Sequence, residues 1–365
     1  MKPELLVTLW PSFPHYRGFS RDSRLAGIRL NSAMMTAPEL DAELEKIRMN
    51  PGRVPLWYDI KGRQPRIIEV IPNEDHLDLR LNHAVEVRTP CPVILKGGAD
   101  HALLDHLEED GRRLVFRGGP RYQVKAGESL YLRDPNLRIK GDILTPDEIA
   151  KIEKVRAAGF KRWFLSYVEQ QSDLDRFQEL VGKDAEIWLK IESMAGLRFV
   201  SEQFRKRDNL VLVAARGDLY VEIDKPHRIG QALRLIVDKD PKACVASRIM
   251  LSVVDKTADT ETLWRYRDAD DNEFYLSQPT ESGWVRSPLT GEALQMTPEK
   301  TYLGANKIVC NPVPSCADFL ELEWLWWFGY RRMMLCDEMC LREDLLTTCV
   351  NAFDAWRQDL PDPAR

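Results

Sequence analysis

Short apolar runs alternate with helical patterns along most of this chain, and this alternation constrains the fold more than any other feature. Strands separated by helix-forming segments are typical of βα units, which build a parallel sheet. We predict eight strands, over residues 5–10, 27–31, 54–60, 162–168, 186–191, 209–215, 243–247 and 332–336. Eight buried parallel strands favour an α/β fold of the closed TIM (β/α)8 barrel type, with a doubly wound open sheet as the alternative.

The helix signals are clearest in the middle of the chain. Thr145-Pro146-Asp147-Glu148 has the order of an N-cap, a first-turn proline and acidic first-turn residues. Apolar residues then recur at helical spacing until Gly159, which is typical of a helix C-terminus. Residues 12–26 hold little helical pattern, so we expect the first helix to be short or irregular.

Two stretches do not follow the alternation of strands and helices, and their patterns predict β-rich insertions. Residues 64–144 alternate and carry Gly-rich turn signals, which predicts a small lid-like domain. Residues 256–310 hold aromatic alternating segments broken by Gly and Pro. The barrel would then comprise residues 1–63 and 145–365. Because the second insertion follows the seventh strand, we expect it on the active-site face, as a lid, a determinant of substrate choice or a subunit contact, with a solvated decoration as the alternative.

Composition excludes several classes of function. The chain has 365 residues, of which 44% are hydrophobic, and its formal net charge is −5 with 52 basic and 57 acidic side chains well mixed. This balance indicates no nucleic-acid partner and no membrane-surface patch. No run of eighteen apolar residues and no leader pattern is present, so we expect a cytoplasmic protein. The seven cysteines lack paired zinc-knuckle spacing and read as reduced thiols.

The active site of such a barrel lies at the carboxyl ends of its strands, so polar residues there are the first candidates. Lys190 and Glu192 stand two apart on one strand and therefore point the same way, while Asp218 follows the end of the next strand. Two carboxylates on adjacent strands are ligands that Mg²⁺ or Mn²⁺ prefers, and the lysine would face an anionic substrate. The alternative is a buried salt-bridge cluster of these three side chains.

The segment from Ala215 through Arg216 and Gly217 to Asp218 adds a possible anion cradle. Its glycine lets a ligand approach the backbone closely, and a run of amides after a strand can hold a carboxylate or phosphate. Further polar residues at strand ends are Arg29, Asn31, Asp59, Lys61, Ser247, Asp337 and Glu338.

Several motifs resemble those of the pyruvate kinase family, in the same order along the chain. KIES (190–193) resembles KIEN, and VAARGDLYVEI (213–223), about twenty-five residues later, resembles VARGDLGVEI. The other matching segments are IRLN (28–31) with ARLN, YDIKGRQPR (58–66) with DTKGPEIR, ASRIMLS (246–252) with ATQMLES, and 314–340 with the PTRAE helix and MLSGET strand. The resemblance covers most of the barrel and implies the barrel type that binds phosphoenolpyruvate and pyruvate.

The resemblance implies a role for each matching residue. Lys190 would stabilise charge on the transferred phosphoryl group and the enolate, Arg29 would contact the phosphate, and Glu192 and Asp218 would ligate the divalent metal. The other implied roles are substrate-carboxylate binding for the backbone of Ala215, Arg216 and Gly217 and for the hydroxyl of Ser247, monovalent-cation binding for Asn31, Asp59 and Ile60, and nucleotide-phosphate binding for Arg66.

The chain also departs from the family pattern. Ser32-Ala33-Met34-Met35 stands where the family has F-S-H-G, so a cation-binding hydroxyl and a histidine are lost. Gln64 stands where the family has a glutamate, or a lysine in its K⁺-independent members. We therefore expect a weak or absent K⁺ requirement. Tyr220 replaces a glycine beside the metal loop. The chain ends after the eighth helix, so we expect it to lack the family's C-terminal regulatory domain.

Three functions follow as hypotheses. The first is a pyruvate-kinase-like, metal-dependent phosphotransferase acting on phosphoenolpyruvate or a related enolpyruvyl or 2-oxo acid, with ADP or ATP as the nucleotide. The second is a lyase, aldolase or decarboxylase that forms a pyruvate enolate with the same metal and lysine but no nucleotide. The third is a non-catalytic binding scaffold. In each case we expect a homo-oligomer.

Overall fold

A computed structural model gives the fold. It describes residues 2–73, 75–134, 136–255 and 314–361, together with the backbone of five strands between 262 and 307.

Eight parallel strands form a closed barrel, as predicted. Their order is the order of the chain, and the last strand, β21, pairs with both β15 and β1, which closes the sheet and rules out the open alternative. The strands are β1 (Glu4–Thr8), β2 (Leu25–Asn31), β3 (Leu56–Ile60), β12 (Arg162–Leu165), β13 (Glu186–Ile191), β14 (Leu210–Ala215), β15 (Cys244–Ala246) and β21 (Arg332–Met334).

The inward faces of β3 and β13 change from apolar to polar along the strands. Trp57 and Trp188 belong to a buried cluster inside the barrel, and their rings lie 5.3 Å apart. Two residues further along the same strands, on the same face, come Asp59 and Lys190. Gly27 makes this packing possible, because a Cβ there would lie 2.4 Å from the Trp57 ring. The lumen is therefore a packed apolar plug with a polar layer above it.

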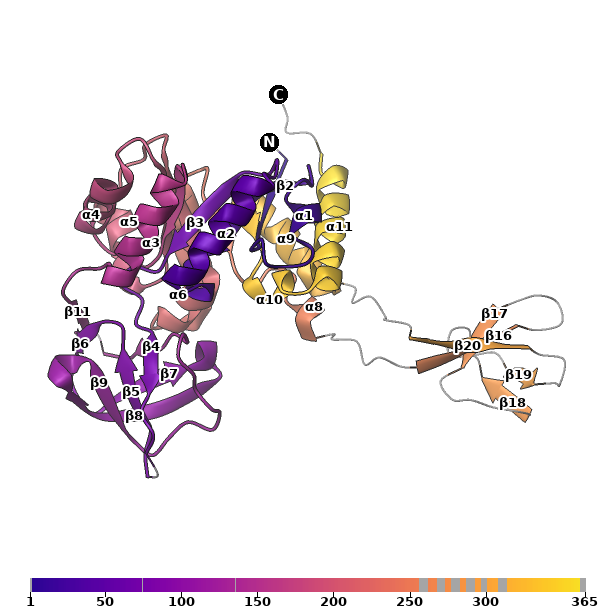
Figure 1. The fold of residues 1–365 in the computed structure, drawn as a ribbon, viewed down its shortest axis with the longest axis horizontal. Coiled ribbons are helices and arrows are strands. Elements are labelled where there is room, and N and C mark those ends of the chain that lie inside the picture. Colours follow the sequence, from indigo (N-terminus) through magenta and orange to yellow (C-terminus); the bar gives the residue numbers. More distant parts are fainter. Residues whose placement is uncertain are drawn as a thin grey trace.

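Helices follow the strands and cover the barrel (Figure 1). The first helix has four residues, in agreement with the expectation of a short element. The helices of the barrel are α1 (Tyr16–Phe19), α2 (Ala37–Met49), α3 (Pro146–Ala157), α4 (Gln171–Val181), α5 (Met194–Glu202), α6 (Arg216–Glu222), α7 (Ile229–Lys239), α8 (Ser252–Asp255), α9 (Cys316–Phe328), α10 (Asp337–Cys340) and α11 (Glu343–Asp359), with 3-10 turns η1 (Ser32–Met34) and η4 (Pro226–Arg228). None of the helices within the described residues is long and apolar enough to cross a membrane.

The stretch between β3 and α3 is a β-rich insertion with a hydrophobic core of its own, as predicted. It lies at the opposite end of the barrel from the N-terminus (Figure 1). Its six-stranded antiparallel sheet has the order β10-β7-β8-β9-β5-β4, and β11 pairs with β6. The elements are β4 (Ile67–Val70), β5 (Asp78–Leu81), β6 (Ala84–Glu86), β7 (Cys91–Leu95), η2 (Lys96–Gly98), β8 (Asp100–Glu108), η3 (Glu109–Gly111), β9 (Arg113–Arg117), β10 (Tyr131–Leu132) and β11 (Arg138–Lys140).

One buried carboxylate joins the two ends of this insertion. Glu148 Oε1 accepts hydrogen bonds from the backbone N–H of Lys61 at 2.9 Å and of Gly62 at 3.0 Å, where the chain leaves the barrel. Its Oε2 accepts from the N–H of Thr145 at 3.0 Å, where the chain returns. The predicted N-cap of α3 is present and forms part of a capping box, whose glutamate also fixes the start of the insertion.

The second insertion contains five strands that form two small antiparallel sheets. Their orders are β17-β16-β20 and β18-β19, which agrees with the predicted β-rich character. The strands are β16 (Thr262–Arg267), β17 (Glu273–Leu276), β18 (Gly283–Arg286), β19 (Ala293–Met296) and β20 (Thr301–Lys307). The expected position over the active-site face depends on residues 256–261 and 308–313, which lie outside the described residues.

Candidate active site

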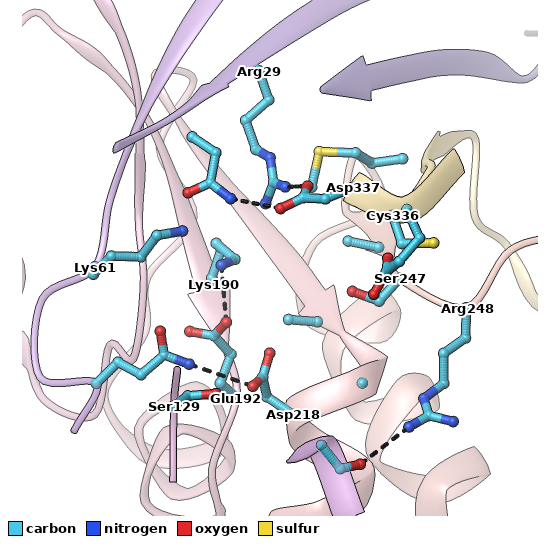
Figure 2. Close-up of a pocket in the computed structure, with 18 of the residues that line it drawn as sticks. Arg29, Lys61, Ser129, Lys190, Glu192, Asp218, Ser247, Arg248, Cys336 and Asp337 are labelled. Atoms are coloured by element: carbon cyan, nitrogen blue, oxygen red, sulfur yellow. Dashed lines mark hydrogen bonds and ion pairs between the residues drawn. The ribbon is translucent and has the colours of Figure 1, made fainter. Parts of the chain in front are cut away.

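A cavity of about 380 Å³ lies where the barrel strands end, between the barrel and the first insertion. Figure 2 shows the side chains that point into it. Nine of the predicted site residues line it: Arg29, Asn31, Arg66, Lys190, Glu192, Ala215, Gly217, Asp218 and Ser247. Three others, Asp59, Ile60 and Arg216, are not part of its lining.

Lys190 is the central cation of the cavity. Its Nζ lies 2.9 Å from Glu192 Oε1, donates to Ser166 Oγ at 2.9 Å and lies 3.8 Å from Asp59 Oδ2. Burial works to lower the pKa of Lys190, but Asp59 and Glu192 outweigh it and hold the pKa above its usual value. The side chain is therefore a fixed ammonium group, suited to stabilising negative charge on a bound substrate.

Glu192 and Asp218 present carboxylate oxygens that fit a divalent metal. Glu192 Oε2 accepts from the Tyr167 N–H at 2.6 Å, whereas buried Oε1 accepts no hydrogen bond of good geometry although Lys190 is near. Burial raises the pKa of Glu192 in spite of Lys190, and nearby Asp218 raises it further. A bound cation would relieve both effects.

The protein offers two carboxylates here rather than a complete cage. Within the described residues, no group of three or more His, Cys, Asp or Glu side chains is arranged to hold a metal ion. Mg²⁺ is commonly bound through one or two carboxylates, with water and substrate oxygens completing its shell. Glu192 and Asp218 would therefore supply only part of such a shell.

Asp59 lies below the cavity within a group of cations. It is fully buried, and its Oδ2 lies 2.9 Å from Lys61 Nζ and 3.2 Å from Arg29 Nη1, in addition to Lys190. Burial opposes ionisation, but Lys190, Lys61 and Arg29 together hold the pKa of Asp59 well below its usual range. This carboxylate is already neutralised by protein side chains.

The other two expected monovalent-cation ligands are also engaged within the protein. The Ile60 carbonyl accepts from the Ser166 N–H at 2.9 Å. Asn31 Oδ1 accepts from the Ala33 N–H at 3.1 Å, inside the η1 turn.

Asp337, at the start of α10, lies beside Arg29 of β2 in the cavity wall (Figure 2). Its carboxylate accepts a hydrogen bond from Arg29 Nη2, and its Oδ2 accepts from Asn31 Nδ2 at 2.6 Å. The sequence places Asp337 at a strand end but gives no sign of this partnership, because the two segments lie about three hundred residues apart.

The segment after β14 brings backbone rather than the arginine side chain to the cavity. Ala215, Gly217 and Asp218 line it. The guanidinium of Arg216 turns away, donating to the Ser247 carbonyl at 2.8 Å and to Glu321 Oε1 at 2.6 Å. Tyr220, which stands where the resemblance implies a glycine, is exposed and does not line the cavity.

The first insertion contributes side chains that sequence reasoning missed or left without a role. Tyr131, on β10, donates its hydroxyl to Asp218 Oδ1 at 2.5 Å, and Gln64 Nε2 lies 3.4 Å from the same oxygen. Arg66, which was expected to bind the nucleotide phosphates, donates to the Gly127 carbonyl at 2.5 Å and also to Gln64. Nothing in the local sequence marks Tyr131 as a contact of Asp218.

A second cavity, of about 650 Å³, lies between the insertion and the barrel. Tyr167, Glu169 and Glu222 line it from the barrel side, and Arg133 lines it from the insertion. Burial raises the pKa of Glu222 to about 8, although Arg133 lowers it.

Comparison with known proteins gives one distant relative and no family model. A pyruvate kinase of Encephalitozoon cuniculi (strain GB-M1) is 27% identical over 250 residues. The aligned region covers 65% of this chain and 54% of that enzyme, so the chain spans about half the length of the relative it matches. No protein-family model matches the chain. The relation to pyruvate kinase is therefore distant, and it agrees with the barrel and its inserted β-sheet.

Proposed function

We propose that this protein is a divalent-metal-dependent enzyme that binds phosphoenolpyruvate or a related 2-oxo acid and stabilises the enolate of pyruvate. The observation that supports this most strongly is the group of Lys190, Glu192 and Asp218 on one cavity at the carboxyl ends of the barrel strands. The same three residues carry the resemblance to pyruvate kinase, the name of the distant relative.

Glu192 and Asp218 would hold Mg²⁺ or Mn²⁺ in this proposal. A bound divalent ion supplies Lewis-acid polarisation of substrate oxygens. Lys190 places its ammonium group beside these carboxylates, where it stabilises negative charge on the enolate oxygen. The backbone of Ala215 and Gly217 forms the wall that would receive the substrate carboxylate.

Phosphoryl transfer of the pyruvate-kinase type is the first candidate reaction. It requires positioning and charge neutralisation rather than covalent catalysis, and Arg29 and Lys190 both face the cavity. The test is a coupled assay of the purified protein with phosphoenolpyruvate, ADP and Mg²⁺, together with calorimetric titration of ADP. Absence of both pyruvate formation and ADP binding would exclude this reaction.

Enolate chemistry without nucleotide is the second candidate, as in a lyase, aldolase or decarboxylase. The observation that favours it is the engagement of Arg66, whose guanidinium is bound to Gly127 and Gln64 instead of standing free for a nucleotide. The test is exchange of the methyl protons of pyruvate with deuterium, followed by NMR. Exchange that requires Mg²⁺ and Lys190 but not nucleotide supports this reaction, and absence of exchange counts against it.

A further inference from the structure

Arg29 is a cavity-lining arginine with three of its donor groups already engaged. Its Nε donates to Thr8 Oγ1 at 2.9 Å, its Nη1 donates to Asp59 at 3.2 Å, and its Nη2 donates to Asp337. The side chain is 7% exposed, so it has little freedom to turn toward other partners. Of its three partners, only Asp337 lines the cavity, so the group bound to Asp337 is the one on the cavity side.

Asp337 differs from Asp59 in its position and access. Asp59 is fully buried beneath the cavity, whereas Asp337 is the first residue of α10, lines the cavity and keeps 34% of its side chain exposed. Asn31 holds its second oxygen at 2.6 Å. A carboxylate is therefore fixed on the open side of Arg29, at a place where a ligand anion would otherwise bind.

We infer that Asp337 is a specificity-determining residue: it occupies the anion-binding side of Arg29 and selects unphosphorylated 2-oxo acids over phosphoenolpyruvate. An arginine such as Arg29 binds a phosphoryl group through directed, charge-assisted hydrogen bonds. To obtain them the phosphoryl group must displace Asp337 or bind beside it, and juxtaposed like charges are strongly unfavourable.

The carboxylate end of the substrate does not meet this obstacle. It would lie against Lys190, the metal ligands and the wall formed by Ala215 and Gly217. In the described part of the chain, none of these residues forms a hydrogen bond or an ion pair with Asp337. This inference rests on the proposed function, and it favours the version that works on a pyruvate-type substrate without phosphoryl transfer.

Two ligands that differ in the phosphoryl group measure this selectivity. Oxalate has the size and charge of a pyruvate enolate, and phosphoenolpyruvate adds the phosphoryl group. With Mg²⁺ present, calorimetry on the full-length wild type is expected to show oxalate binding at least about tenfold more tightly than phosphoenolpyruvate. Equal affinities, or tighter binding of phosphoenolpyruvate, would overturn the inference without any variant.

Asp337→Ala and Asp337→Asn test the residue itself. Both remove the competing charge, and the asparagine keeps the size of the side chain if alanine impairs folding. We expect each to tighten phosphoenolpyruvate binding by about tenfold or more, with oxalate affinity changed by less than about threefold. Glu338→Gln is the matched control, because it removes a neighbouring cavity carboxylate that, among the described residues, forms no hydrogen bond or ion pair with Arg29. If the role of Asp337 were purely structural, its substitution would instead weaken the binding of both ligands.

A separate measurement distinguishes failure of the proposed function from failure of the inference about Asp337. If oxalate shows no Mg²⁺-dependent binding to the wild type, the metal-enolate proposal fails, and inorganic phosphate becomes the probe for Asp337. Tighter phosphate binding by Asp337→Ala, but not by Glu338→Gln, then still supports the inference. Unchanged phosphate binding overturns it.

Discussion

The Tyr131 hydroxyl donates a 2.5 Å hydrogen bond to Asp218 Oδ1, and this bond joins the inserted sheet to the barrel at one of the two proposed metal ligands. The charged acceptor makes it stronger than a neutral hydrogen bond. Nearby, Arg133 donates to the Val221 carbonyl at 2.6 Å, so the insertion contacts both ends of α6. The insertion is thus held partly by Asp218 itself, so a change in the contacts of this carboxylate would also change how the insertion is held.

Tyr131→Phe is expected to loosen the insertion. A hydrogen bond to a charged group contributes about 1.5–3 kcal/mol, so its loss should raise the opening of this contact by about tenfold or more. Hydrogen exchange of amides in 64–144 should become faster, most clearly near β10. Tyr122→Phe, at an exposed tyrosine of the same insertion, is the control. Unchanged exchange in Tyr131→Phe would show that other contacts hold the insertion.

Glu192→Gln and Asp218→Asn are each expected to weaken Mn²⁺ binding by at least about tenfold, because each removes an anionic oxygen ligand. Titration monitored by electron paramagnetic resonance measures the free ion directly. Glu169→Gln, at a carboxylate facing the second cavity, should leave Mn²⁺ affinity unchanged. If the two site variants bind Mn²⁺ as tightly as the wild type, the metal assignment is wrong.

The cations around Asp59 lead us to expect K⁺-independent ligand binding in the wild type. Lys61→Met removes the nearest of the three cations around Asp59, so the buried carboxylate is left with less compensating charge and the folded state is destabilised. We expect this variant to melt at a lower temperature and to recover partly in KCl but not in tetramethylammonium chloride. Lys151→Met, which removes a buried lysine paired with Asp147, is the control. Equal melting temperatures in both salts would contradict the prediction.

The raised pKa of Glu222 predicts a pH-dependent stability. Its unfolded pKa is near 4.5 and its folded pKa is about 8, so between these values the unfolded chain releases a proton that the folded protein keeps. Stability from this group is present below pH 4.5 and is lost as the pH rises toward 8. Over this range, Glu222→Gln should therefore become more stable relative to the wild type. We expect a gain of about 2 kcal/mol, smaller than the full pKa shift implies, because the side chain keeps some solvent access.

Chemical denaturation at several pH values measures this difference. Glu202→Gln, on the exposed part of α5, controls for the loss of a surface charge. A difference between Glu222→Gln and the wild type that stays constant with pH would contradict the assigned titration.

The barrel could be predicted from sequence because its signals are local. Each strand is a short apolar run, and Thr145 and Glu148 indicate the start of the helix at 146–157. The grouping of Lys190 and Glu192 follows from strand alternation, and that of Asp218 follows from the meeting of strand ends in a barrel.

The contacts that refine the site were not predictable in this way. Asp337 meets Arg29, and Tyr131 meets Asp218, only because the closed barrel and the inserted sheet bring distant segments together. The side-chain direction of Arg216 depends on Glu321, which belongs to α9. Periodicity gives the face of a strand or helix on which a residue lies, but it does not give the partner across a cavity.

The bonds of Glu148 to the backbone of Lys61, Gly62 and Thr145 have a consequence for protein engineering. They hold the exit and return points of the first insertion together at the rim of the barrel. The barrel strands on either side, β3 and β12, pair directly with each other. A short linker could therefore replace the entire sheet without stretching the chain, and a foreign module could be grafted at the same two points.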